Sequence, residues 1–252
     1  MQNFEEEYRQ VQPTLKKWIS LILLGKKIEI RRPQNFVAEG PTIIVGNHCG
    51  AAKDVATVLR IVPRPVFFTA NREIFTQGDF DALIRKHLRR HLGDLGLATN
   101  ILIKPVKIAF IRFVTTNITK VGTIPVDLRT GREDTRQRIQ HYLKKGRAII
   151  ALQGRGRVHP KDPHPYISRF RPGTSAIAYS LLDGCGLSVP VTPLAIYGTQ
   201  KPWLVPSTIR VNVGEPMFIQ DYSRGTADEI VERFRNALEL RVRTLFLDLL
   251  KD

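Results

Sequence analysis

A histidine and an aspartate six residues apart are the side chains of this sequence best suited to acid–base chemistry. His48 and Asp54 lie in residues 42–54, Thr-Ile-Ile-Val-Gly-Asn-His-Cys-Gly-Ala-Ala-Lys-Asp. A carboxylate beside a histidine fixes the ring tautomer and stabilises the imidazolium that forms when the ring accepts a proton. The pair therefore suits a general base. A helix cap at His48, with Asp54 complementing the helix dipole, explains the same residues without catalysis.

The residues around this pair predict a strand followed by a helix. Thr42 to Val45 is rich in β-branched residues and predicts a short buried strand, which Gly46-Asn47 is expected to end. Ala51 to Arg60 predicts a helix with small residues in its first turn. His48 would then lie at a strand-to-helix turn, exposed at the edge of a sheet, with Asp54 in the first turns of the helix.

A second group of candidate residues follows another apolar segment. Residues 149–157 read Ile-Ile-Ala-Leu-Gln-Gly-Arg-Gly-Arg and end in Gln153, Gly154, Arg155 and Arg157. Glycines let a backbone approach a ligand closely, and an arginine side chain binds phosphate through two parallel hydrogen bonds. The pattern indicates an anion site, and a solvated basic loop is the alternative.

Two further segments complete the set of candidates. Residues 122–129, Gly-Thr-Ile-Pro-Val-Asp-Leu-Arg, place Arg129 just beyond a predicted strand at 122–127. Residues 190–198, Pro-Val-Thr-Pro-Leu-Ala-Ile-Tyr-Gly, are apolar and could wall a site without taking part in the chemistry.

Strands and helices alternate along the rest of the chain. Strands are predicted at 28–31, 65–70, 148–152, 188–197 and 208–213, and helices at 79–92, 101–114, 130–146, 174–182 and from 226 onward. Thr130 and Thr226 each open a segment with capping-box spacing. The alternation predicts a single α/β domain at 28–252, with a largely parallel or mixed central sheet flanked by helices, preceded by an amphipathic segment at 1–27.

The charge balance points to an anionic partner. The chain has 39 Lys and Arg against 23 Asp and Glu, a net charge of +16. Nucleic acid, an anionic membrane face and phosphate-bearing small molecules are all candidates. The two cysteines, Cys49 and Cys185, have no metal-ligand spacing, so we expect no metal site and a reducing compartment.

Two apolar segments are candidates for contact with a membrane surface. Trp18 to Leu24 is too short to span a bilayer, which needs about 20 residues, but lysines flank it and Trp18 could lie at headgroup level. Ile101 to Val114 is apolar except for Lys104, Lys107 and Arg112, a pattern that fits a helix in a membrane surface or beside an acyl chain. Helices packed in the protein core are the alternative for both.

In their order and spacing these segments resemble the glycerophospholipid acyltransferase superfamily, which includes bacterial 1-acyl-glycerol-3-phosphate acyltransferases. Asn47-His48 with Asp54 resembles its Asn-His-x4-Asp block, and residues 152–157 lie where the family has Phe-Pro-Glu-Gly-Thr-Arg. Residues 122–129 and 190–198 resemble the second and fourth blocks. The resemblance covers about residues 28–222.

The sequence departs from the family pattern in all of its polar blocks. Arg129 follows an extra Leu128, and Arg157 lies one step beyond the family's arginine. His48 and Asp54 enclose five residues where the family has four, and Gly50 lies in that longer segment, where a glycine allows a changed loop path. Gln153 replaces the family's glutamate. Arg155 takes the place of its threonine, and Gly156 that of its arginine. These changes affect the expected acceptor more than the expected reaction.

The resemblance implies a role for each candidate. His48 takes the proton from an acceptor hydroxyl and Asp54 orients His48, while Arg155, Arg157 and Arg129 are the candidates for holding an acceptor phosphate. Gln153 and Gly154 complete the expected substrate-binding set. The hydroxyl oxygen attacks an acyl thioester directly. Cys49, as a nucleophile beside His48, is the alternative.

The implied protein is an acyltransferase of phospholipid biosynthesis. It would move a fatty acyl group from acyl-CoA or acyl carrier protein to a lysophospholipid such as 1-acyl-glycerol-3-phosphate, with no cofactor besides the acyl thioester. An anionic membrane surface is the expected partner, and a peripheral or monotopic place on the cytoplasmic face the expected location. A non-catalytic lipid-binding relative is the main alternative, and a basic nucleic-acid-binding protein, on the charge and the Gly-Arg-Gly-Arg run, is the less favoured one. We expect no nucleic-acid binding, because zinc-finger spacing and an RNP-type aromatic pattern are both missing.

Overall fold

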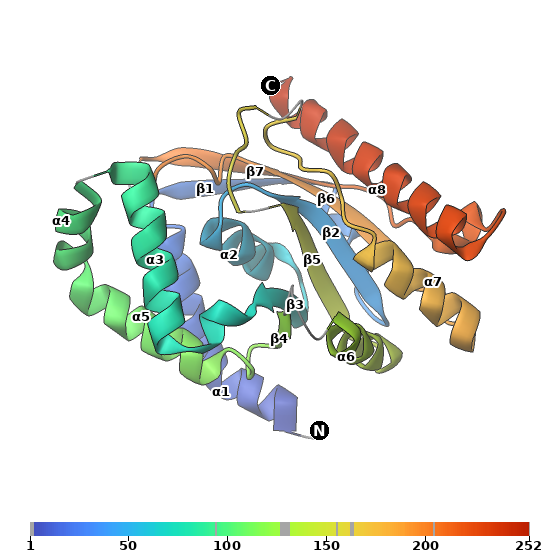
Figure 1. Ribbon diagram of the computed structural model, residues 1–252, viewed down its shortest axis with the longest axis horizontal. Coiled ribbons are helices and arrows are strands. Elements are labelled where there is room, and N and C mark those ends of the chain that lie inside the picture. Colours follow the sequence, from blue (N-terminus) through green and yellow to red (C-terminus); the bar gives the residue numbers. More distant parts are fainter. Residues whose placement is uncertain are drawn as a thin grey trace. The chain divides into compact units, whose positions relative to one another are not determined.

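The chain forms a mixed sheet of seven strands flanked by helices (Figure 1). The computed structural model describes residues 3–93, 95–126, 132–154, 156–161, 164–203 and 205–251. The strands are β1 (Lys26–Arg31), β2 (Thr42–His48), β3 (Val66–Asn71), β4 (Thr123–Val126), β5 (Ala148–Gly154), β6 (Val191–Tyr197) and β7 (Ser207–Val213). Their order in the sheet is β1-β7-β6-β2-β5-β3-β4.

Both strand directions occur in this sheet. β2 runs parallel to β5 and β6, β1 parallel to β7, and β3 parallel to β4, while β6 and β7 are antiparallel. The predicted α/β class, the mixed sheet and its flanking helices are therefore confirmed. The predicted boundary between residues 27 and 28 falls inside β1.

The helices connect and follow these strands. They are α1 (Asn3–Ile22), α2 (Ala52–Ile61), α3 (Gln77–Leu92), α4 (Leu95–Leu102), α5 (Lys104–Asn117), α6 (Arg132–Lys144), α7 (Gly173–Cys185) and α8 (Ala227–Leu250), with short 3-10 helices η1 (Pro33–Asn35), η2 (Arg72–Phe75) and η3 (Ile219–Tyr222). By compactness the chain divides into one unit of Ile19–Phe67 with Arg136–Asp252, and another of Met1–Trp18 with Phe68–Thr135.

In the first unit, β2 is a central strand with an apolar side chain on each face. Ile43, Ile44 and Val45 are all buried, as expected for a continuous apolar run between two neighbouring strands. Helix α8 packs on β6 and β7 through one apolar stripe, which includes Phe234, Leu238, Val242, Leu245 and Leu249 (Figure 1). Its predicted start is confirmed, because Thr226 and Glu229 form both hydrogen bonds of a capping box.

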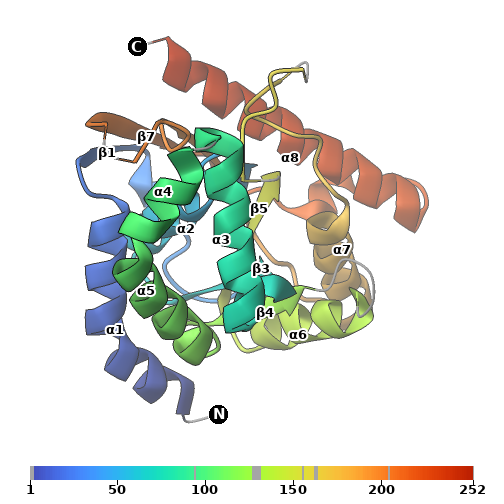
Figure 2. The same ribbon diagram turned by 60° about the vertical axis from the view of Figure 1, so that its left-hand side comes forward.

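In the second unit, α3 packs against α4 and α5 (Figure 2). Trp18 of α1 packs on α5, with its ring centroid 5.0 Å from that of Phe110 and 6.1 Å from that of Phe113. Trp18 therefore contacts protein aromatics, as the packed-helix alternative required. Lys107 is buried on α5 and binds Asp81 of α3 with an Nζ–Oδ1 distance of 2.6 Å.

Several element boundaries differ from those predicted, and three of them have a clear physical reason. Residues 101–114 are not one helix: α4 ends at Leu102 and α5 begins at Lys104, because Pro105 favours the first turn of a new helix. β2 continues through Gly46 to His48, where a Cβ at Gly46 would lie 2.7 Å from the Leu194 carbonyl oxygen. α7 passes Gly184 and ends before Gly186, which has the left-handed φ of 64°.

In the described part of the chain, no helix has both the length and the apolar composition needed to cross a membrane.

Candidate active site

His48 and Asp54 meet at the carboxyl end of β2. His48 Nδ1 lies 2.8 Å from Asp54 Oδ2. The Asp54 side chain is fully buried, whereas that of His48 is 23% exposed. A carboxylate on Nδ1 favours the tautomer with its proton there, which leaves Nε2 as the proton acceptor. Within the described residues Nε2 has no hydrogen-bond partner. The pair has the geometry of a general base with its orienting carboxylate.

Backbone amides hold the Asp54 carboxylate in this orientation. Its Oδ2 also accepts hydrogen bonds from Cys49 N at 2.9 Å and Gly50 N at 2.7 Å. One carboxylate oxygen thus receives three donors, two of which belong to the turn that connects β2 with α2. The imidazole orientation is therefore fixed by the backbone of this turn as well as by the carboxylate.

The longer spacing between His48 and Asp54 is accommodated at Ala51. Ala51 has φ 51° and ψ −124°, the conformation of the first central residue of a type II′ turn, which glycine normally occupies. Gly50 O accepts the closing hydrogen bond from Lys53 N at 3.1 Å. Such a backbone costs about 1–3 kcal/mol and is found mainly at functional sites. Our expectation that Gly50 would change the loop path is therefore wrong.

Gly50 serves close packing instead. A Cβ there would lie 2.3 Å from the Thr199 Cβ, so only glycine lets the turn contact residue 199. Lys53 Nζ donates to the Lys201 carbonyl oxygen and ties α2 to the same loop. Burial lowers the pKa of the Lys53 ammonium, and the charge of Lys26 lowers it further. The turn that carries Asp54 is thus anchored on the segment after β6.

Two glycines bring the end of β5 against His48. Gly154 pairs with His48 in the sheet, and a Cβ at Gly154 would lie 2.7 Å from the His48 carbonyl oxygen. A Cβ at Gly156, which has φ 67°, would lie 3.2 Å from His48 Nε2. Both positions therefore need glycine, and the backbone at Gly156 passes directly beside the free ring nitrogen.

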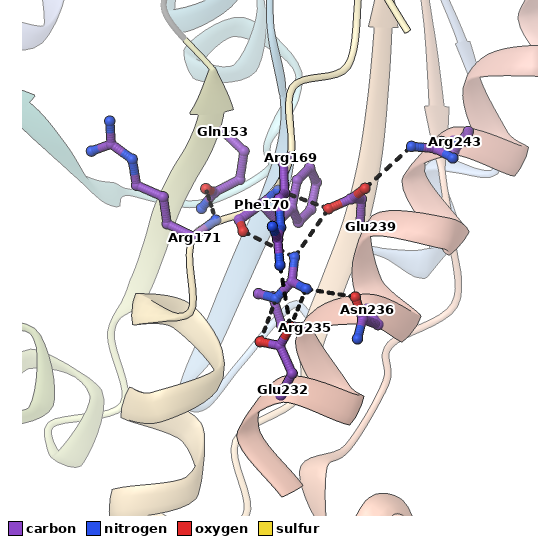
Figure 3. A network of polar contacts seen from close by, with 9 residues as sticks. All are labelled: Gln153, Arg169, Phe170, Arg171, Glu232, Arg235, Asn236, Glu239 and Arg243. Atoms are coloured by element: carbon purple, nitrogen blue, oxygen red, sulfur yellow. Dashed lines mark hydrogen bonds and ion pairs between the residues drawn. The ribbon is translucent and has the colours of Figure 1, made fainter. Parts of the chain in front are cut away.

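Gln153 is directed away from this nitrogen. Side chains alternate along a strand, so Gln153 points to the sheet face opposite to that of its neighbour Gly154 and of the paired His48. Its Oε1 accepts a hydrogen bond from Arg171 N at 3.1 Å (Figure 3). The structure therefore does not bring Gln153 together with His48.

A charged network centred on the buried Arg235 continues from Gln153 to α8 (Figure 3). Glu239 Oε2 accepts from Phe170 N at 2.8 Å, and Arg235 Nη1 donates to Phe170 O at 3.2 Å. Arg235 is almost fully buried and also binds Glu232, Glu239 and Asn236. Hydrogen bonding to Glu232 raises the pKa of the Arg235 guanidinium. The network fixes the far end of the loop that starts at Gly154.

Sequence reasoning missed this network. Glu232 and Glu239 lie three residues before and four residues after Arg235, which is ion-pair spacing on a helix. That spacing was a usable signal for a charge cluster on α8. Its contact with Phe170, 65 residues away in the chain, was not readable from the sequence.

The structure describes one of the three candidate arginines. Arg157 is half-buried and forms no hydrogen bond or ion pair within the described residues. It follows Gly156, the residue beside His48 Nε2, and so belongs to the same loop. Arg129 and Arg155 lie outside the described residues.

Cys49 lies beside His48 in the chain but is buried, with its Sγ 3.7 Å from Thr199 Oγ1. Burial raises the pKa of the Cys49 thiol to about 12, and the nearby Asp54 carboxylate adds to the shift. Reactive cysteines have low pKa values and accessible sulfur atoms. The structure therefore gives Cys49 the properties of a packing residue.

We predict that native Cys49 resists alkylation. With a pKa of about 12, only about one thiol in 10⁴ is a thiolate at pH 8. Exposed Cys185 provides the matched control. Iodoacetamide treatment followed by peptide mass spectrometry should show label at Cys185 alone, and Cys185→Ser should abolish labelling of the native protein. Rapid labelling of Cys49 before unfolding would contradict its buried thiol state.

Among the described residues, no group of three or more His, Cys, Asp or Glu side chains is placed to hold a metal ion.

The fold and the site together describe an α/β protein with a histidine–aspartate pair at the end of a central parallel strand. A solved structure with the same fold is the 1-acyl-sn-glycerophosphate (LPA) acyltransferase PlsC from Thermotoga maritima, at a TM-score of 0.56. The alignment covers 97% of this chain and 83% of that protein, at 17% sequence identity. At this identity the likeness establishes the fold. No protein-family model and no curated protein sequence matches the chain.

Proposed function

We propose that the chain is an acyltransferase that uses His48 as a general base. The observation that carries the proposal is the 2.8 Å contact between His48 Nδ1 and the buried Asp54 carboxylate, with Nε2 left without a partner. The solved acyltransferase with the same fold supports the same reaction class. The proposed donor is acyl-CoA or acyl carrier protein, and the proposed acceptor is a lysophospholipid such as 1-acyl-glycerol-3-phosphate.

The proposed reaction is a direct transfer with no enzyme-bound acyl intermediate. His48 Nε2 removes the proton of the acceptor hydroxyl while its oxygen bonds to the thioester carbonyl carbon. The carbon–sulfur bond then breaks, and the imidazolium returns its proton to the departing thiolate. Asp54 stabilises the imidazolium between the two steps, and glycine at residue 156 keeps a Cβ from lying 3.2 Å from Nε2.

The proposed partner is the anionic surface of a membrane, on its cytoplasmic face. The net charge of +16 and the exposed Lys16 and Lys17 on α1 favour such a surface. The Lys26 ammonium is held against the protein by hydrogen bonds to the carbonyl oxygens of Pro202 and Val205. Lys27 is paired with Glu29 at 2.8 Å.

An acceptor screen tests this function. Purified protein is incubated with acyl-CoA and, in separate reactions, with lysophosphatidic acid, glycerol 3-phosphate and an uncharged monoacylglycerol, and free thiol release is recorded. Acceptor-dependent release with the phosphorylated acceptors, and a matching acylated product by mass spectrometry, would support the proposal. Binding of lysophosphatidic acid without turnover with any acyl thioester would favour the non-catalytic lipid-binding alternative.

Arg157 should matter mainly for a phosphorylated acceptor. Arg157→Ala removes a charge-assisted hydrogen bond, worth about 1.5–2 kcal/mol at a half-buried position, and should raise the acceptor KM by about 10- to 30-fold. The KM for the acyl donor should change little. Arg171→Ala is the matched control, because Arg171 is an exposed arginine whose backbone N, rather than its side chain, binds Gln153. An unchanged KM in Arg157→Ala would assign the phosphate to another cation.

A further inference from the structure

An unusually apolar elbow lies between α4 and α5. Within residues 101–108, four large apolar side chains are exposed: Ile101 at 65%, Leu102 at 82%, Val106 at 49% and Ile108 at 38%. Isolated exposed apolar side chains are common on proteins, whereas Ile101 and Leu102 are neighbours in the chain, and grouped exposed apolar side chains mark binding surfaces. We call residues 101–108 the α4–α5 elbow.

The elbow is held in place by contacts on its inner side. Lys107 is buried, and its Nζ binds Asp81 Oδ1 and Asn100 Oδ1, each at 2.6 Å. These contacts fix α5 on α3 and on the end of α4. The outward direction of the four apolar side chains is therefore set by an anchored backbone, and Figure 2 shows the three helices side by side.

Backbone hydrogen bonds hold the bend between α4 and α5. Ile103 N donates to Thr99 O at 3.0 Å and Lys107 N donates to Ile103 O at 2.8 Å. Pro105 has no amide proton to satisfy. These two contacts fix the backbone on both sides of Lys104.

The charge of the residues around the elbow favours an anionic lipid surface over a second copy of the protein. Residues 95–126 contain no aspartate or glutamate, while Lys104 and Arg112 are exposed basic side chains. Two copies of this surface would bring like charges together, which opposes self-association. An anionic lipid surface takes apolar side chains below its headgroups and pairs its phosphates with the cations beside them.

We propose that the α4–α5 elbow docks the protein on an anionic membrane surface. Ile101 and Leu102 enter the boundary between headgroups and acyl chains, and Lys104 lies among the lipid phosphates. This inference rests on the membrane partner of the proposed function and gives that partner a specific contact surface. Its test measures vesicle binding directly, so that a failure of docking and a failure of catalysis are separate results.

The test compares a variant of the elbow with a variant of an exposed leucine on another helix. Ile101→Asp/Leu102→Asp removes the elbow's apolar tip, and Leu240→Asp, at a side chain 63% exposed on α8, is the matched control. In flotation with phosphatidylglycerol-rich vesicles, the elbow variant should bind at least ten-fold less than wild type, and Leu240→Asp should bind as wild type does. Vesicles of phosphatidylcholine alone should bind all three proteins weakly.

A second variant keeps the proposal testable if the double variant does not fold. Lys104→Glu leaves the apolar side chains intact and should reduce the preference for phosphatidylglycerol over phosphatidylcholine, whereas Lys120→Glu should not. Binding should also weaken as salt rises, because the screening length falls to about 10 Å at 0.1 M. Equal binding of wild type and both elbow variants would overturn the proposal. A second result would also overturn it: wild type sediments as a dimer, and the elbow variant sediments as a monomer that still binds vesicles as wild type does.

Discussion

His48→Ala should lower turnover of an acyl thioester by about 10²–10⁴-fold, the usual contribution of a general base. The imidazole is held by Asp54 at 2.8 Å, and its free Nε2 faces the backbone at Gly156. Removing the ring takes away the proton acceptor while leaving the carboxylate bound to the two backbone amides of the turn. The measurement is the initial rate of thiol release at saturating acceptor.

A matched histidine distinguishes chemistry from a general effect of the substitution. His141 is exposed on α6, so His141→Ala should keep wild-type turnover. The His48→Ala protein should also retain vesicle binding and a cooperative unfolding transition. Near-normal turnover in purified His48→Ala would refute the general-base mechanism, whatever the reaction's substrates prove to be.

Local sequence patterns were sufficient to predict most helices and strands of the fold. β-branched runs at residues 43–45 and 149–150 became central strands, and the capping box at Thr226 marked the start of α8. The break at Lys104 was readable as well, since a proline in a helical pattern often marks a helix start. Treating the whole apolar segment as one helix ignored that signal.

Tertiary packing decided what those patterns could not. Gly46 looked like the end of a strand, but β2 passes through it because β6 approaches too closely there for a side chain. The same reason explains Gly154 and Gly156, which indicated a backbone that approaches a ligand closely. In each case a glycine marked a close contact whose partner is distant in the sequence.

In the candidate site, too, residue types predicted one part and tertiary structure decided the other. The pairing of His48 with Asp54 was predicted from residue types, and the contact is present. The catalytic role of the pair stays a prediction. The two backbone donors to Asp54 depend on the positive φ of Ala51, a residue whose type gives no hint of that conformation. These donors change what an asparagine at position 54 should do.

Asp54→Asn should lower turnover by about 10- to 100-fold while keeping the His48 tautomer. Asp54 Oδ2 accepts all three hydrogen bonds, from His48 Nδ1, Cys49 N and Gly50 N. The asparagine oxygen must take that place, because the opposite orientation would direct an NH₂ group at two backbone N–H donors. The Nδ1–H contact therefore survives, and the substitution removes the negative charge alone.

The expected loss follows from that charge. A hydrogen bond to a charged partner is worth about 1.5–3 kcal/mol, and the imidazolium forms only during the reaction, so its stabilisation is lost mainly from turnover. The asparagine NH₂ would occupy the place of Oδ1, which has no partner among the described residues, at a cost of about 1–3 kcal/mol in folding free energy. Chemical denaturation should report that loss separately from the rate.

Asp54→Ala separates orientation from charge. It leaves two buried backbone N–H groups and His48 Nδ1 without their acceptor, so it should destabilise the fold by more than Asp54→Asn and lose the ring orientation as well. Its turnover should therefore lie below that of Asp54→Asn and approach that of His48→Ala. The ¹⁵N chemical shifts of the His48 ring should report an Nδ1–H tautomer in wild type and Asp54→Asn. Wild-type turnover in Asp54→Asn, with that tautomer intact, would show that the carboxylate charge contributes nothing to the reaction.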